Sequence, residues 1–180
     1  MLELRPDRAR PATIEPTAPD RFKVQFTATA ELREQLERLR DLMRSSVPDG
    51  DLAVIIAAAV RDKIATLEAA RFAATEHPRK SLEETDTTPS SRHVPAAVRR
   101  GVHERDGQQC AYRDEQGRRC SARGWLEYHH RRPYGLGGEH SVANVALLCR
   151  AHNAMLAAVD YGGRHPRPAL AGPRPTVARR

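Results

Sequence analysis

The sequence predicts a mixed α+β protein made of two small modules. One run alternates apolar and polar residues with the period of a strand, and apolar residues at helical spacing follow it. The C-terminal half then shows the order strand, loop, strand, helix. Aromatic residues make up only 4% of the 180 residues, so we expect compact modules joined by polar segments rather than one large core.

The first module is expected to begin with a strand. Residues 1–20 are rich in proline and arginine without periodicity, which predicts a flexible N-terminus. Phe22, Val24 and Phe26 then alternate with polar residues, as in a half-buried strand.

Two helices are expected after this strand. Thr29 is a good N-cap residue for the first helix, and apolar residues follow it at helical spacing. The stretch "SVPDGD" breaks the pattern, and Asp51 is placed to cap a second helix. The sequence therefore predicts a strand–helix–helix module over residues 21–70.

This order resembles the ribbon-helix-helix class of DNA-binding dimers. The resemblance implies a homodimer through residues 21–70, with the polar strand face against DNA. That face would carry Lys23, Gln25 and Thr27. The alternative is a helical scaffold with a covering strand.

A polar, proline-containing linker is predicted over residues 71–91, and a second domain over residues 92–162. A helix would begin after Pro95 and stop at Gly107. Residues 163–180 form an arginine-rich stretch without acids, predicted to be a basic flexible tail.

The net charge of +7 favours a polyanionic partner such as nucleic acid, although a charge excess that only aids solubility is the alternative. The longest apolar run, "LAVIIAAAV", is too short to span a bilayer, so no membrane partner is expected. The N-terminus lacks the apolar core of a secretory signal. The expected location is therefore the cytoplasm.

The three cysteines suggest a metal site rather than a disulfide framework. Cys110 and Cys120 lie on either side of a turn signal, while Cys149 and His152 are spaced to share one side of a helix's first turn. Together they would make a Cys₃His site, a set that structural zinc uses. Three unrelated cysteines and a surface histidine are the alternative.

The stretch between the two ligand pairs carries a second motif, "LEYHHRRPYGLGGEHSVANVALLCRAHN". It resembles the HNH endonucleases of the ββα-metal class over residues 92–162. The span from about residue 20 to 162 also resembles the C-terminal portion of a larger group of bacterial HNH proteins. The resemblance implies a zinc-stabilised ββα-metal domain that hydrolyses phosphodiester bonds of DNA, with Mg²⁺ or a similar divalent ion at the active site.

The resemblance also implies roles for single residues. His130 would be the general base, His129 a ligand of the catalytic metal, and Asn144 the residue that ties the loop in place. In the preferred register His152 binds zinc and Asn153 binds the catalytic metal. In the alternative register His152 is the last residue of the motif, which leaves the three cysteines without a fourth ligand.

Four arginines near the motif are candidates for phosphate contacts, with ordinary solvated side chains as the alternative: Arg99, Arg100, Arg131 and Arg132. Two other functions remain open. The domain would either bind nucleic acid without cutting it, or be a nuclease remnant fused to a ribbon-helix-helix regulator.

Overall fold

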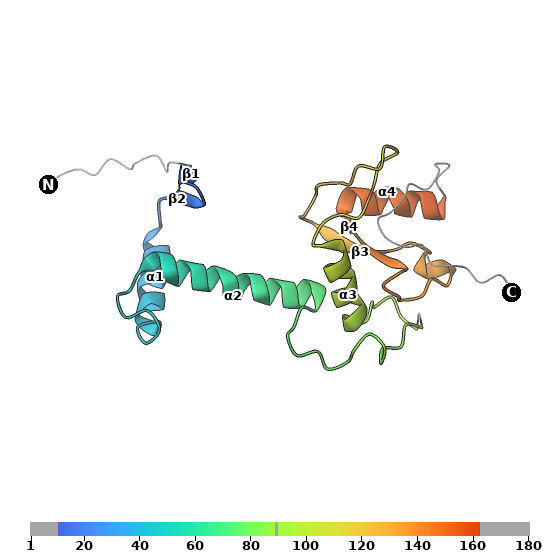
Figure 1. Cartoon of the computed structure of the whole chain (residues 1–180), viewed down its shortest axis with the longest axis horizontal. Coiled ribbons are helices and arrows are strands. Elements are labelled where there is room, and N and C mark those ends of the chain that lie inside the picture. The colour runs from blue at the N-terminus through green and yellow to red at the C-terminus, as the bar shows by residue number, and fades with distance from the viewer. Residues whose placement is uncertain (1–10, 89, 163–180) are drawn as a thin grey trace. The chain divides into compact units, whose positions relative to one another are not determined.

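The structure is a computed structural model of the chain, and it describes residues 11–88 and 90–162. These residues form a mixed α+β protein with four α-helices and two small antiparallel sheets, so the predicted α+β class is confirmed (Figure 1). The chain divides into two compact units, Met1–Lys63 and Ile64–Arg180. Each unit is described separately below.

The first unit opens with a β-hairpin rather than a single strand. Strand β1 (Thr13–Ala18) pairs antiparallel with β2 (Arg21–Gln25), and Asp20 turns the chain with a left-handed φ of 59°. The expectation of a flexible segment over residues 1–20 is therefore corrected for β1, whereas residues 1–10 lie outside the described residues. The sequence hid β1 because its pairing uses backbone groups and its side chains show little apolar alternation.

Little of the first unit is buried. Among residues 11–63, the buried hydrophobic side chains are Val47 and Ile55. One face of the hairpin carries Ile14, Phe22 and Val24, which are 61–71% exposed. An uncovered apolar face of this kind leaves the hairpin with little packing to stabilise it.

Two helices follow the hairpin, α1 (Ala30–Leu42) and α2 (Leu52–Phe72). Thr29 and Asp51 cap them as predicted, each accepting a hydrogen bond from a backbone N–H in the first turn. In the part of the chain that the structure describes, no helix combines the length and apolar character needed to cross a membrane.

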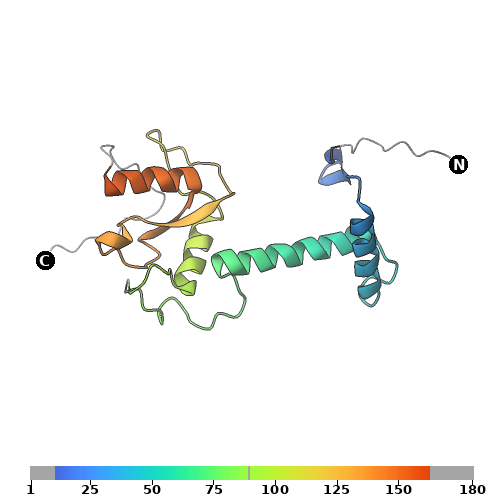
Figure 2. The ribbon, with the colours of Figure 1, turned by 180° about the vertical axis from the view of Figure 1, so that it is seen from behind.

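The second unit is built around a two-stranded antiparallel sheet of β3 (Leu126–His130) and β4 (Val145–Cys149). Helix α3 (Ala96–Asp106) packs on one face of this sheet and α4 (Arg150–Tyr161) on the other (Figures 1 and 2). Proline starts α3 and a left-handed glycine ends it, as expected. A single 3₁₀ turn, Tyr134–Leu136, lies in the loop between the strands.

Strand β4 is the centre of the core because it is apolar on both faces. Val145 and Leu147 pack with side chains of α3 in one cluster, whereas Ala146 and Leu148 pack with Leu156 of α4 in the other. Successive residues of a strand point to opposite faces, so a five-residue apolar run serves both helices at once.

The segment predicted to be a linker, residues 71–91, is tied to the second unit. Helix α2 extends into it as far as Phe72, whose ring stacks on His103 with 4.2 Å between ring centroids. Backbone carbonyls further along accept hydrogen bonds from side chains of the second unit, such as Arg100. A polar composition indicated a linker, but it gives no sign that the backbone serves as a hydrogen-bond partner.

Asp106, at the end of α3, holds the helix to the sheet. Its carboxylate is 2% exposed and accepts a 2.8 Å hydrogen bond from the backbone N–H of Leu147. Arg105 pairs with the same carboxylate and also donates to the carbonyl of Val145. The edge of β4 that β3 leaves unpaired is satisfied in this way.

We predict that Asp106→Ala lowers the free energy of unfolding by about 1–3 kcal/mol, because the N–H of Leu147 loses its partner inside the core. Denaturant unfolding followed by circular dichroism would measure this. Glu104→Ala, at an exposed position of the same helix, is the control and should change stability by less than about 0.5 kcal/mol. Equal unfolding midpoints for the two variants would contradict the role given to Asp106.

Candidate functional site

Four potential metal ligands come together in the second unit. Cys110, Cys120, Cys149 and His152 each bring one ligand atom to a cluster in which all four atoms lie within 4.8 Å of one another. Nδ1 of His152 lies 3.3 Å from Sγ of Cys149 and 3.5 Å from Sγ of Cys110. Tetrahedral zinc would place sulfur and nitrogen ligands about 3.5 Å apart, so this group could hold a structural metal such as zinc.

The local structure explains how distant residues reach this cluster. A turn begins at Asp114, whose carboxylate accepts backbone hydrogen bonds from Gln116 and Arg118, and it brings Cys110 and Cys120 side by side. Cys149 ends β4 and is the N-cap of α4, which places His152 in the first helical turn.

The surroundings of the cluster shift the protonation of two of its potential ligands. Burial, together with the neighbouring Cys149 and Cys120, raises the pKa of Cys110 to about 11, so a bound cation would be needed to hold this sulfur as thiolate near neutral pH. Burial also lowers the pKa of His152, which favours the neutral imidazole that binds metals. The ring of Tyr112 stacks on that imidazole with 3.7 Å between centroids.

A second pair of donors lies between β3 and α4. Nδ1 of His129 is 2.9 Å from Oδ1 of Asn153, whose amide nitrogen donates to Glu127. The distance is that of an ordinary N–H···O hydrogen bond. His152 and Asn153, although adjacent in the sequence, thus have different partners.

Asp160 also lies near His129, although it was not predicted from the sequence. One of its carboxylate oxygens lies 3.7 Å from Nε2 of His129, and both side chains are almost fully buried. Asp160 follows Asn153 by seven residues, a spacing that places both on one side of a helix. That spacing is the signal that would have identified it.

His130 lies beyond this pair at the end of β3. Burial, together with the nearby His140 and His129, lowers its pKa to about 4. Its Nε2 is 2.9 Å from Nδ1 of His140, a buried residue that the motif did not single out. The ring of His130 is therefore neutral near pH 7.

Asn144 closes the loop between the strands. Its side chain is buried, accepts from the backbone N–H of Arg132, and donates to the carbonyls of Arg132 and Glu139. The chain passes so close here that a Cβ on Gly138 would lie 1.9 Å from the carbonyl oxygen of Arg132. A side chain at Gly138 would therefore push the loop open.

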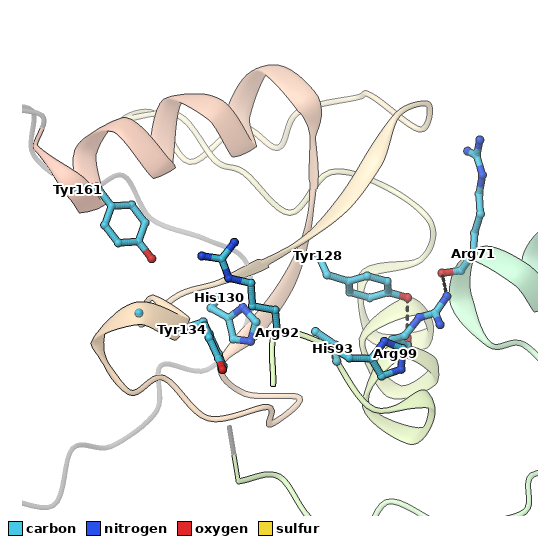
Figure 3. Close-up of a pocket in the computed structure, with 10 residues that line it drawn as sticks. Arg71, Arg92, His93, Arg99, Tyr128, His130, Tyr134 and Tyr161 are labelled. Atoms are coloured by element: carbon cyan, nitrogen blue, oxygen red, sulfur yellow. Dashed lines mark hydrogen bonds between the residues drawn. The ribbon is translucent and has the colours of Figure 1, made fainter. Parts of the chain in front are cut away.

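An open cavity of about 520 Å³ lies beside His130 (Figure 3). The described residues that line it include three arginines, two histidines and three tyrosines, and no carboxylate. Arg92 and Tyr161 line the cavity together with His130 (Figure 3), and neither was predicted from the sequence. A lining of this kind suits an anionic ligand.

The four arginines expected at phosphates differ in their surroundings. Arg99 lines the cavity, where it lies 5.7 Å from the ring centroid of Tyr128 and donates to carbonyls at the end of α2. Arg100 and Arg132 each donate to a backbone carbonyl. Arg131 is only 8% exposed, so it does not offer a surface contact.

The strand residues expected at DNA belong to the first unit. Lys23 and Gln25 lie in β2 and are exposed, with Glu15 and Thr13 of β1 as their cross-strand partners. Because Glu15 stands opposite Lys23, the positive charge of this face is partly compensated. Thr27 follows the strand.

Comparison with known proteins found no protein-family model that matches the chain, and no significant match among curated proteins or solved structures.

We predict that the purified protein holds one zinc ion per chain, and that His152→Ala or Cys149→Ser removes it. A strong chelator should lower the free energy of unfolding by several kcal/mol, because metal binding to such a site is part of the folding free energy. Elemental analysis by mass spectrometry and thermal unfolding would measure both effects.

The matched control is His77→Ala, at an exposed histidine away from the cluster, which should keep the zinc. Protein prepared with zinc that contains none, or a His152→Ala variant that still holds a full equivalent, would contradict the assignment.

Proposed function

We propose that the chain is a metal-dependent endonuclease of the HNH type, with a ββα-metal domain in its second unit. The observation that carries the proposal is the position of His130. Its neutral imidazole lies at the edge of a cationic cavity, next to His129 and Asn153, whose side chains can bind a metal ion. The strand–loop–strand–helix order of β3, β4 and α4 supports it.

His130 would act as the general base. A water molecule gives its proton to Nδ1 of His130, its oxygen bonds to the phosphorus, and the bond from phosphorus to the leaving 3′ oxygen breaks. That oxygen then takes a proton from solvent. The lowered pKa keeps His130 unprotonated near neutral pH, the state in which a general base must begin.

His129 and Asn153 would hold the catalytic cation, with Asp160 beside them. A divalent ion bound there supplies Lewis-acid stabilisation of the negative charge that develops on the phosphate. The sequence alone suggested Mg²⁺ or a similar ion. An imidazole donor suits a transition-metal ion better, so we propose Mn²⁺ or Ni²⁺ as effective substitutes.

The cavity would receive the substrate phosphate. Arg92 and Arg99 bring guanidinium groups to its lining, and these groups bind phosphate oxygens with paired hydrogen bonds. Contacts between arginine and phosphate are independent of base sequence, so they do not identify the nucleic acid. DNA is the proposed substrate because of the HNH resemblance.

We predict that the protein cuts supercoiled plasmid DNA when Mn²⁺, Ni²⁺ or Mg²⁺ is added, and that EDTA stops cleavage. His130→Ala should lower the cleavage rate by about 100-fold or more, because it removes the general base. Gel electrophoresis of the plasmid forms would measure this, with His77→Ala as the matched histidine control.

The zinc content of His130→Ala should equal that of the wild type, which shows that the variant is folded. A wild-type protein that binds DNA and zinc but cuts with none of the three ions would favour the second candidate function, a binding module that does not cleave.

We also propose that the first unit pairs with a second copy of the chain. Within residues 11–63 only two hydrophobic side chains are buried, whereas Ile14, Phe22 and Val24 lie exposed on one hairpin face. So small a core does not offset the entropy of ordering the chain. Pairing two hairpin faces would remove this apolar surface from water.

We predict a dimer in sedimentation analysis at micromolar concentration. The double variant F22S/V24S should weaken its dissociation constant by about 100-fold or more, because it removes large apolar side chains from the paired face. K23S/Q25S, on the opposite face of the same strand, is the matched control. A monomeric wild type, or a dimer equally weakened by both double variants, would rule out pairing through this face.

A further inference from the structure

Two histidines of the second unit form a hydrogen-bonded chain that ends on the backbone. Nε2 of His130 faces Nδ1 of His140 at 2.9 Å, and Nε2 of His140 lies 2.7 Å from the carbonyl oxygen of Ser91. His140 is 2% exposed, and His130 borders the cavity. A buried histidine that links a cavity residue to the backbone has a defined orientation.

The carbonyl of Ser91 sets the direction of every hydrogen bond in this chain. A carbonyl oxygen only accepts, so Nε2 of His140 carries a hydrogen. In neutral His140 the other nitrogen, Nδ1, is then an acceptor. Nε2 of His130 must donate to it, which leaves Nδ1 of neutral His130 without a hydrogen.

The neutral pair is the state that the surroundings favour. Neither ring has a carboxylate as hydrogen-bond partner among the described residues, and burying an unpaired charge is costly. No hydrogen bond from the described part of the chain occupies Nδ1 of His130. That nitrogen is therefore the one left to accept a proton.

His140 is itself held from three directions. Its backbone N–H donates to the carbonyl of Thr87 at 2.8 Å, and its side chain reaches Ser91 of the same segment. The ring of Tyr134 stacks on it, with 5.8 Å between centroids and an angle of 15° between planes. The segment that the sequence suggested was a linker thus anchors this ring.

We propose that His140 is a positioning residue that fixes the orientation and tautomer of His130, so that Nδ1 is the nitrogen that accepts the proton. The inference rests on the proposed role of His130 as general base. Beyond that role, His130 would be oriented by a second histidine, His140, which is itself held by the backbone carbonyl of Ser91 before α3.

The first test is the tautomer of His130 in the zinc-loaded wild-type protein. Long-range ¹H–¹⁵N correlation spectra distinguish a protonated ring nitrogen from a bare one, and the signals of His130 are assigned as those that vanish in His130→Gln. We expect hydrogen on Nε2 and none on Nδ1. Hydrogen on Nδ1 would overturn the proposal, and this measurement needs neither substrate nor a variant of His140.

Two amide variants separate the two hydrogen bonds of His140. The amide of His140→Asn stands as far along the side chain as Nδ1 and can still accept from His130. The amide of His140→Gln stands as far along as Nε2, so it can still donate to Ser91, but it has a carbon rather than an acceptor at the position of Nδ1. The two variants are therefore a matched pair.

We expect His140→Gln to give a mixture of His130 tautomers and to lower kcat about 10-fold or more with little change in KM, because only the base is disturbed. His140→Asn should keep the wild-type tautomer and the larger share of kcat. Equal tautomer ratios and equal kcat in the two variants would refute the proposal.

The spectra also separate this inference from the proposed function. If the protein shows the expected tautomers but cleaves no nucleic acid, the nuclease proposal fails and the role of His140 as general-base partner fails with it, while its control of the His130 ring stands. If the protein cleaves and the tautomer is the opposite one, only the inference about His140 fails.

Discussion

The Cys₃His cluster is the constraint on which the rest of the second unit depends. Its ligands come from a turn after α3, from the end of β4 and from the first turn of α4, so one metal-type site joins three segments. The residue after His152 is Asn153, which faces His129. Any shift of the Cys₃His cluster would therefore also move Asn153, the partner of His129. The position of the first turn of α4 is thus common to both groups of side chains.

The second unit also has a small hydrophobic core, which is built on both faces of the sheet. With apolar residues on both faces of β4, α3 and α4 each find a surface to pack on, and Asp106 satisfies the edge that β3 does not reach. Domains of this size bury a limited fraction of their surface. A bound metal or buried hydrogen bonds such as those of Asp106 therefore add needed stability. The loop between β3 and β4 is held in the same way, by hydrogen bonds between the buried side chain of Asn144 and the loop backbone.

Much of this could be predicted from sequence because the signals were local. Caps at Thr29 and Asp51, a glycine stop at Gly107 and the three-residue step from Cys149 to His152 all act within a few residues. The hairpin partner strand β1 and the anchoring role of the segment before α3 depend on backbone pairing, which side-chain patterns do not report. His140 was missed because its meaning depends on contact with Ser91, distant in the chain.

Neighbouring histidines on a strand point to opposite faces, which poses a geometric problem for a site that needs both. His129 pairs with Ala146 on the face of α4, and His130 pairs with Val145 on the face of α3. The two faces meet where β3 ends. The last residues of α4 lie at this point as well. Asp160 lies near His129, and Tyr161 lines the cavity with His130. A phosphate beyond the end of β3 would therefore have the proposed cation ligands on one side and the proposed base on the other.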